Sequence, residues 1–337
     1  MGFWRLTLGC RISAKPNVAN NRSERTVMIL SIERLIDDAE CFKVVRELRW
    51  PEQVKCPHCG SDHITKQGFR KTQPHRQRYL CKSCYYPFDD LSGTIFAGHH
   101  QPLRIWILCL YFMGLNQSNL QIAQELNLNK DDVQKMTTQL RTGIVKKKPV
   151  VILQENVECD EVYVVAGHKG NPVAIREKGR NSRRNRLKGS RGRGTLAKEK
   201  PPIFGMIQRG GEVVIHMLEN VQQRTIEPII KKTIAAGTLI YTDEYNIYAR
   251  LQQWGYGHKT VNHSLGEYAR DEDGDGLHEV HVNTMEGFWS LLRSWLRPHR
   301  GISQEKLPIY LGFFEFVHNV RKRGQALLPS LLHLLLC

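Results

Sequence analysis

The spacing of apolar and polar residues divides the chain into a helical first part and a second part that mixes strands and helices. Apolar residues at helical spacing predict an amphipathic helix over 31–48 and helical structure throughout 94–146. Within that region we expect helices at 103–113, 118–126 and 130–145. Short β-branched and aromatic runs predict strands at 157–165, 203–208, 212–218 and 237–244, and further helices are expected at 225–235, 281–293 and 307–320.

The order of these elements indicates a mixed α/β sheet. Three strands in succession, the last two joined as a hairpin through residues 209–211, precede a helix and a fourth strand. In such a sheet the first and fourth strands can be neighbours. Asp160 inside the first strand and Asp243 at the end of the fourth can then lie side by side. The alternative for Asp243 is a capping role for the segment 245–253.

The first strand carries three acidic residues, whereas a buried strand normally has none. Alternation places Glu158 and Asp160 on one face and Glu161 on the other. A carboxylate in mid-strand is typical of a metal ligand or a catalytic group. The alternative is an edge strand with a solvated acidic face.

Two Cys-x-x-Cys pairs, separated by residues 60–80, predict a zinc ribbon. The four ligands are Cys56, Cys59, Cys81 and Cys84. Four thiolates close the tetrahedral coordination of Zn²⁺, so this zinc is expected to be structural. It would hold a basic platform against DNA or a partner chain, formed by Lys66, Arg70, Lys71, Arg76, Arg78 and Lys82.

The helices expected at 118–126 and 130–145 are joined by a tight turn and resemble a helix-turn-helix that contacts DNA. A helical hairpin that only packs in a core is the alternative.

The chain of 337 residues has a net charge of +16, which favours a polyanionic partner. Nucleic acid and an anionic membrane surface are both such partners, and no apolar run is long enough for a membrane span. Residues 169–200 hold twelve Lys and Arg against two Glu, which predicts a flexible phosphate-binding insertion; the alternative is a merely solvated loop. Its candidate DNA-binding residues are Arg180, Arg183, Arg184, Arg186, Lys188, Arg191 and Arg193.

Nine cysteines, four of them in close pairs, indicate metal binding in a reducing compartment rather than a disulfide framework. Residues 1–27 have no clear periodicity and no signal-peptide pattern, so we expect a disordered extension or a start codon assigned too early.

Glu286 can be interpreted in two compatible ways. With Asn283 as N-cap it would complete a capping box at the start of a helix. It can also supply a third carboxylate near Asp160 and Asp243. Arg293 follows on the same helical face, where it could bind a phosphate.

The run 271–276 begins like a calcium-binding EF-hand loop. That loop needs a bidentate Glu at its twelfth position, where Val282 stands, so we do not expect a calcium site.

Three converging carboxylates suit a pair of divalent cations, which activate one oxygen nucleophile and stabilise the departing oxygen in phosphoryl displacement. On DNA, water would attack a phosphodiester and the freed 3′-hydroxyl would attack a second one.

The motifs taken in this order resemble the zinc-ribbon DDE transposases of insertion sequences, the prokaryotic relatives of Merlin elements. The segments that carry the resemblance are 56–59, 81–84, 158–163, 241–243 and 281–289. The resemblance implies an RNase H-like catalytic domain with Asp160, Asp243 and Glu286 as catalytic acids. Some members of this group have Asn as the third residue, which leaves Asn283 as the alternative to Glu286.

The resemblance also implies catalytic Mg²⁺ or Mn²⁺, structural Zn²⁺, and binding of terminal inverted repeats and target DNA by a homo-oligomer. Membrane and small-molecule partners are not expected, and the location would be cytoplasmic, at the nucleoid of a prokaryote. The expected organisation is an extension (1–27), helix and zinc ribbon (28–92), helix-turn-helix region (93–148), catalytic domain (150–323) and hydrophobic tail (324–337).

Two other functions are compatible with these residues. One is a non-catalytic DNA-binding protein derived from a transposase, against which the intact acid set argues. The other is an RNase H-like repair nuclease, although the zinc ribbon and helix-turn-helix suit the recognition of DNA ends better.

Overall fold

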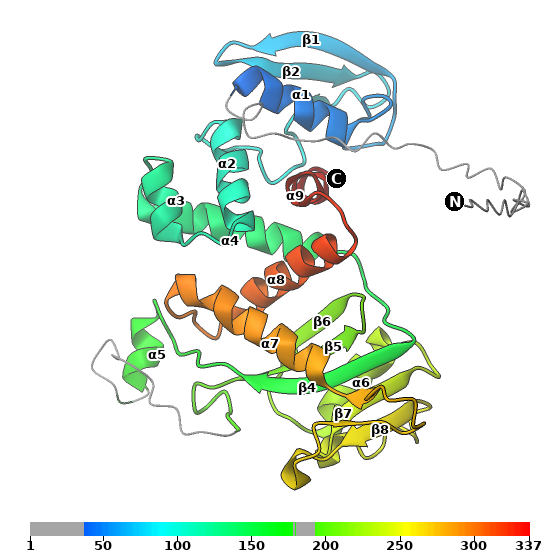
Figure 1. The fold of residues 1–337 in the computed structure, drawn as a ribbon. Coiled ribbons are helices and arrows are strands. Elements are labelled where there is room, and N and C mark those ends of the chain that lie inside the picture. Colours follow the sequence, from blue (N-terminus) through cyan, green and yellow to red (C-terminus); the bar gives the residue numbers. More distant parts are fainter. Residues whose placement is uncertain (1–36, 178, 180–192) are drawn as a thin grey trace, which may run out of the picture.

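The computed structural model describes residues 37–177, 179 and 193–337. In Figure 1 these residues form three parts stacked one above the other: a small sheet with α1, a group of helices, and a larger sheet covered by helices. The extension expected over 1–27 lies outside the described residues.

The first part is a three-stranded antiparallel sheet with one helix. Strands β1 (Ile64–Arg70), β2 (Gln73–Cys81) and β3 (Pro87–Asp89) pair in the order β1-β2-β3. Helix α1 (Asp38–Arg49) begins after Asp37, whose side chain accepts a hydrogen bond from the Ala39 N–H at 3.1 Å. Of the helix expected over 31–48, residues 31–36 lie outside the described part of the chain; α1 begins at Asp38, because Asp37 caps it in an extended conformation.

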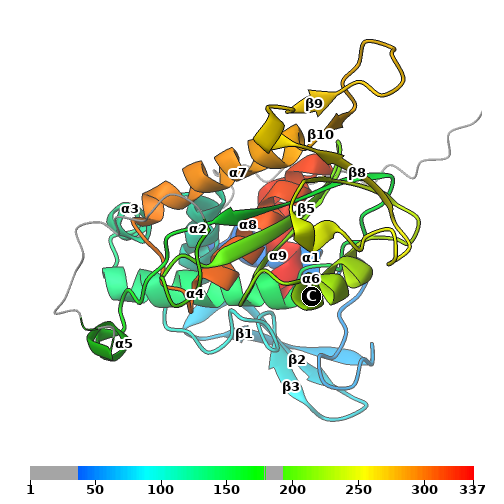
Figure 2. The same ribbon diagram turned by 90° about the horizontal axis from the view of Figure 1, so that it is seen from below.

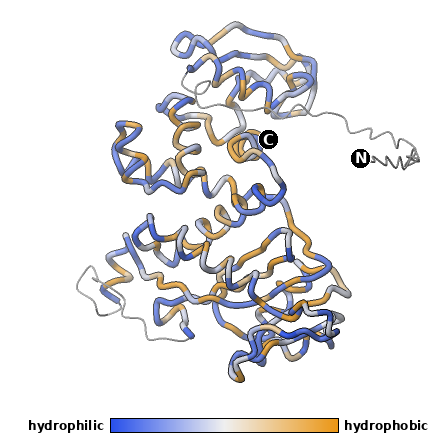
Figure 3. The backbone as a smooth tube through the Cα atoms, in the orientation of Figure 1, coloured by the Kyte–Doolittle hydropathy of each residue, from blue (hydrophilic) through white to orange (hydrophobic). Residues whose placement is uncertain are grey.

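The second part contains α2 (Leu103–Gly114), α3 (Asn119–Glu125) and α4 (Lys130–Lys147). Residues 94–102 form turns, so the expectation of helix throughout 94–146 is wrong for that stretch. Helix α9 (Leu327–Leu336) packs into the same core as α1, α2 and α4, where Leu331, Leu332 and Leu335 are completely buried. The strongly hydrophobic C-terminal segment, visible in Figure 3, is thus a core helix.

The third part is a five-stranded mixed sheet in the order β6-β5-β4-β7-β8. Its strands are β4 (Asn156–Tyr163), β5 (Pro202–Gln208), β6 (Val213–Met217), β7 (Leu239–Asp243) and β8 (Gly257–Val261). β4 is central, antiparallel to β5 and parallel to β7. The predicted element order is therefore correct, and the edge-strand alternative for the acidic strand is wrong.

Helices cover both faces of this sheet. Helix α6 (Gln223–Thr233) contributes to the apolar core on one face, together with Cys159 and Phe204. On the other face, α7 (Asn283–Leu296) packs on β4 and β5, and α8 (Leu307–Lys322) packs on β6 (Figure 2). Since α8 also packs on α4, it joins the sheet to the helical part.

Shorter elements complete the described chain. They are α5 (Pro172–Glu177), the 3₁₀ helices η2 (Asn246–Tyr248), η3 (His263–Leu265) and η4 (Arg297–His299), and the strand pair β9 (Ala269–Arg270) and β10 (Val280–His281). The predicted flexible insertion thus contains a short helix. Helix α6 begins at Gln223, two residues before the helix expected at 225–235, so Pro228 lies inside it rather than in the first turn that the expected start would give. None of the helices in the described residues has the length and apolar character needed to cross a membrane.

Candidate active site and metal centre

The four predicted zinc ligands converge at the end of the small sheet. Their sulfur atoms all lie within 4.8 Å of one another, and the Cys56–Cys84 and Cys59–Cys81 Sγ distances are 3.7 Å and 3.6 Å. A tetrahedron of thiolates around zinc has sulfur–sulfur distances of about 3.75 Å, given Zn–S bonds near 2.3 Å. The four residues therefore fit a structural zinc ion.

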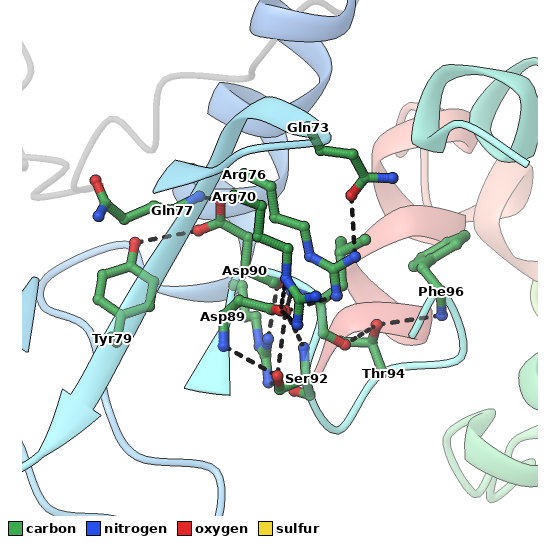
Figure 4. A network of polar contacts seen from close by, with 12 residues as sticks. Arg70, Gln73, Arg76, Gln77, Tyr79, Asp89, Asp90, Ser92, Thr94 and Phe96 are labelled. Carbon is green, nitrogen blue, oxygen red and sulfur yellow. Dashed lines mark hydrogen bonds and ion pairs between the residues drawn. The ribbon is translucent and has the colours of Figure 1, made fainter. Parts of the chain in front are cut away.

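A buried acidic pair connects this ribbon to α1 (Figure 4). Asp89 forms ion pairs with Arg70 and Arg76, each at 2.8 Å. Asp90 pairs with Arg46 of α1 at 2.8 Å and accepts a hydrogen bond from the Tyr79 hydroxyl. Arg76 is largely buried in this pair, whereas the Arg70 side chain remains 49% exposed. The other members of the predicted basic platform are exposed as well: Lys66, Lys71, Arg78 and Lys82.

The two helices of the predicted helix-turn-helix are present. Ser118 and Gln121 form a capping box at α3, and Asn129 caps α4 by accepting from the Asp131 N–H at 2.8 Å. The exposed start of α4 carries both signs of charge, Lys130 beside Asp131 and Asp132. Sequence reading by this pair remains a prediction.

The sheet places Asp160 and Asp243 next to each other. β4 and β7 pair in parallel, with Glu158 opposite Tyr241. Two residues further along each strand, Asp160 and Asp243 follow on the same face, because side chains alternate with a period of two. This is the face covered by α7, whose Trp289 contacts Asp160.

Helix α7 brings Glu286 to the same region. The Glu286 side chain is 54% exposed, and its Oε1 lies 4.0 Å from Nε2 of His263. Burial raises the pKa of Asp160 to about 6, and repulsion from the charges of Asp243 and Glu286 contributes. Burial also raises the pKa of Asp243, to which the charge of Glu244 adds. In the described part of the chain, the three carboxylates do not form a cluster with all ligand atoms within 4.8 Å.

Close packing orients Asp160. Trp289 Nε1 donates a 2.8 Å hydrogen bond to its Oδ2. The residue opposite Asp160 on β5 is Gly205, where a Cβ atom would lie 2.5 Å from Cη2 of Trp289. A glycine is therefore needed for the indole to lie across the strand.

The start of α7 differs from the predicted capping box. Val282 is the N-cap, and no side chain of the helix caps it. Asn283 is its first residue and is exposed, as Glu286 is. The N–H of Met285 donates instead to Oε2 of Glu158, at 2.9 Å. A distant carboxylate on β4 thus replaces the local cap.

Glu161 lies on the opposite face, as alternation predicts. Its Oε1 accepts a hydrogen bond from the Tyr248 hydroxyl in the core that includes α6. Burial raises the pKa of Glu161 to about 8, although this hydrogen bond opposes the shift.

Of the seven candidate DNA-binding residues, Arg193 lies within the described part of the chain. Its guanidinium carbon lies 3.5 Å from the ring centroid of Tyr245, whose N–H donates to Oδ1 of Asp243 at 3.1 Å. Arg293 is exposed on α7 and lines a cavity of about 270 Å³ beside the end of β4. The other six candidates lie outside the described residues: Arg180, Arg183, Arg184, Arg186, Lys188 and Arg191.

Several residues beside the acids were not anticipated. They are Trp289, His263, Glu244 and Arg209. Glu244 accepts the His263 N–H at 3.1 Å and so holds η3 beside Glu286. Trp289 ends the segment 281–289 that carries the family resemblance, but nothing in that segment indicated a contact with Asp160; the other three residues belong to none of the motifs.

The acidic turn at 271–276 gathers the carboxylates of Asp271, Asp273 and Asp275 within 4.8 Å. They accept backbone N–H groups of their own turn, such as that of Gly274 at 2.7 Å. Val282, at the twelfth loop position, is buried in an apolar cluster and supplies no ligand.

Comparison with known proteins places this arrangement in a family. Residues 152–319 match the ISXO2-like transposase domain, and residues 36–86 match the transposase zinc-ribbon domain. A protein in transposable element ISH50 of Halobacterium salinarum is 32% identical over 308 residues, which cover 90% of this chain and 99% of that protein. The chain is a zinc-ribbon DDE transposase of the insertion-sequence type.

Other similarities to this transposase are more distant. A transposase-like protein of Haemophilus influenzae is 27% identical over 103 residues, covering 31% of this chain and 77% of that protein. The pre-cleavage Mos1 transpososome has a TM-score of 0.25 at 11% identity, covering 67% of this chain and 75% of that one. The expected family and the RNase H-like fold are confirmed by the family match and by the strand order.

Proposed function

We propose that this transposase binds the terminal inverted repeats of its element, cleaves DNA strands there and transfers them to target DNA. Asp160, Asp243 and Glu286 are the proposed catalytic acids. The observation that carries the proposal is the parallel pairing of β4 and β7, which brings Asp160 and Asp243 to one face of the sheet. Glu286 is on the helix covering that face, and its charge acts on Asp160.

The three carboxylates fit divalent cations of the Mg²⁺ or Mn²⁺ type, because hard cations prefer carboxylate oxygens. Asp160 and Asp243 would hold them from the sheet, and the exposed Glu286 side chain is free to turn toward them from α7. When bound, such cations activate the attacking oxygen and stabilise the departing one. The zinc ribbon would hold Zn²⁺ through Cys56, Cys59, Cys81 and Cys84.

The protein's own residues prepare this site. Trp289 holds Asp160 by a hydrogen bond to its carboxylate and so restricts its rotamers. Two arginines are the proposed contacts to backbone phosphates: Arg193, above Tyr245 beside Asp243, and Arg293, two helical turns after Glu286. Water attacks the first phosphodiester, and the freed 3′-hydroxyl attacks the second.

DNA recognition is proposed for the zinc-ribbon and helical regions, residues 28–148, and for the basic insertion at 169–200. The exposed platform lysines and arginines of the ribbon and the start of α4 are the proposed contacts. Because two element ends must be joined, we propose that the protein acts as a homo-oligomer on DNA.

The test is a strand-transfer assay on DNA that carries the element's own ends, with Mg²⁺ or Mn²⁺. Asp160→Ala and Asp243→Ala should abolish cleavage and strand transfer while leaving DNA binding in a gel-shift assay intact. Glu227→Gln is the control, because Glu227 is partly exposed on α6 at the other face of the sheet and pairs with Lys231 of the same helix; it should retain full activity.

The third acid is tested separately. Glu286→Gln should be inactive and Asn283→Ala active. The reverse result would move the third role to Asn283.

Two other results would contradict the proposal. Retained strand transfer in both Asp160→Ala and Asp243→Ala would refute the catalytic assignment. Specific binding of the element's ends without cleavage by the unaltered protein would favour a non-catalytic DNA-binding protein.

A further inference from the structure

Resting on the proposed function, we infer that Glu158 and Arg209 form a positioning pair that sets the three carboxylates relative to one another. Neither residue was assigned a role by the motifs. Glu158 lies two residues before Asp160, and two of the pair's contacts, Met285 and Tyr241, lie one and two residues before Glu286 and Asp243.

Glu158 links β4 to the start of α7. It is completely buried, and its Oε1 forms an ion pair with Nε of Arg209 at 2.7 Å. Its Oε2 accepts the Met285 N–H at 2.9 Å. Glu158 shares a strand face with Asp160, and Met285 precedes Glu286. One carboxylate therefore ties the strand of the first acid to the helix of the third.

Arg209, after β5, uses its remaining nitrogens to hold the chain that leads into α7. Nη1 donates to the Glu279 carbonyl at 2.7 Å, and Nη2 donates to the His281 carbonyl at 2.8 Å. Its backbone N–H donates to the carbonyl of Asn156, at the start of β4. These contacts fix the turn after β5 against both β4 and the entry to α7.

The same guanidinium reaches the strand of the second acid. Its Cζ lies 3.9 Å from the centroid of the Tyr241 ring, a cation–π contact. Tyr241 precedes Asp243 by two residues and shares its strand face. The pair therefore contacts β4, β7 and α7, the three elements that carry the acids.

The burial of Glu158 explains why this contact can determine position. α7 has no side-chain cap of its own, so its first turn leaves N–H groups that need acceptors. A carboxylate is the favoured partner there, because the helix N-terminus carries partial positive charge. Removing one member of the pair would leave the other as a buried charge with incomplete compensation.

Glu158 is a positioning residue rather than a catalytic one. It is completely buried, and its two carboxylate oxygens are bound to Arg209 and to the Met285 N–H, so it does not face DNA. We expect Glu158 to act by setting the distance between the carboxylates on β4 and α7. Its substitution should therefore weaken metal binding more than it lowers the melting temperature.

The experiment compares Glu158→Gln with Glu315→Gln in the full-length protein. Glu315 is a matched control, because it is 2% exposed, pairs with Lys148, and accepts the Ile215 N–H of β6 at 3.2 Å. For each variant we would measure the Mn²⁺ concentration that gives half-maximal cleavage, the affinity for Mn²⁺ alone by calorimetry, and the melting temperature.

We expect Glu158→Gln to raise the half-maximal Mn²⁺ concentration and the dissociation constant by about tenfold or more, as for other residues that orient metal ligands. Glu315→Gln should lower the melting temperature without changing either metal value. Arg209→Lys keeps the charge but loses the fork that holds α7, so it should shift the metal values in the same direction.

Wild-type metal values in folded Glu158→Gln or Arg209→Lys would overturn the positioning role. If Glu158→Gln does not fold, the metal values of Arg209→Lys decide whether the pair positions the site. An equal rise of the Mn²⁺ dissociation constant in Glu315→Gln would show that the effect comes from a general loss of stability, and would overturn the positioning role. Failure of the proposed function looks different, because Asp160→Ala would then cleave DNA like the unaltered protein.

Discussion

Trp289 Nε1 donates a 2.8 Å hydrogen bond to Oδ2 of Asp160. Trp289 lies three residues after Glu286, so α7 both presents the third proposed acid and restrains the first. The indole is buried between the helix and the sheet and can lie across β5 only because Gly205 has no side chain. The geometry of the proposed site thus depends on an aromatic residue outside the acid set.

Trp289→Phe should weaken metal binding most strongly at low pH. The indole hydrogen bond favours the ionised form of Asp160, so its loss should raise the pKa of this carboxyl further above the value of about 6 that burial produces. Mn²⁺ affinity measured by calorimetry should therefore fall more at pH 6 than at pH 8. Trp254→Phe, in the core on the other face, is the control and should keep the wild-type pH profile.

Gly205→Ala should destabilise the protein by about 1–3 kcal/mol through overpacking. The added Cβ would lie 2.1 Å from Cε of Met285 and 2.5 Å from Trp289, so α7 would have to move away from β5. Gly287→Ala is the control on α7, because a Cβ there meets nothing within 4 Å. Urea unfolding should show that this control is at least as stable as wild type, and an unchanged midpoint for Gly205→Ala would contradict the packing argument.

The stabilisation that protonated Asp160 and Glu161 give the metal-free protein should be lost as pH rises from about 4 to about 8. Burial raises the pKa of Asp160 from 3.8 to about 6 and that of Glu161 from 4.5 to about 8. The folded state therefore holds these protons more tightly than the unfolded state, and this stabilisation is lost as pH rises through the folded pKa values. Asp160→Asn should stabilise the metal-free protein at pH 8 by about 1–3 kcal/mol.

This pH effect is checked by urea unfolding at several pH values in the presence of a chelator. Asp275→Asn, an exposed substitution in the acidic turn, is the control and should leave the pH dependence unchanged. A pH dependence in Asp160→Asn identical to that of the wild type would contradict the prediction.

Cys59→Ser should remove the zinc ion and loosen the ribbon. Native mass spectrometry should change from one zinc per chain to none. Trp50 packs against Tyr79 and Phe88, with ring centroids 5.6 Å and 6.2 Å away, so its emission should shift to longer wavelength when the ribbon opens. Cys337→Ser, at the exposed C-terminal residue, should keep the zinc; zinc retained at full occupancy in Cys59→Ser would rule out the four-cysteine centre.

Local pattern was sufficient wherever the determining residues lie close together in the sequence. The ribbon ligands come as two Cys-x-x-Cys pairs, and the order of strands and helix predicted that β4 and β7 can be neighbours, as they are in the sheet. Alternation along β4 separates Asp160 from Glu161, because side chains in a strand point to opposite faces in turn.

Distant contacts were beyond such patterns. A capping box of Asn283 and Glu286 is a reasonable local prediction, but Glu158, 127 residues before Met285, caps the helix instead. The leucine-rich C-terminal segment likewise becomes a core helix only through its packing on α1, α2 and α4.

The sequence by itself determined the family, the zinc ligands and the candidate acids, because motif spacing and side-chain periodicity are properties of the local chain. The tertiary structure alone decided which residues hold those acids. Three contacts between separate elements are examples: the hydrogen bond from Trp289 to Asp160, the ion pair of Arg209 with Glu158, and the hydrogen bond from the His263 N–H to Glu244. Such partners are selected by packing and burial rather than by their spacing in the sequence.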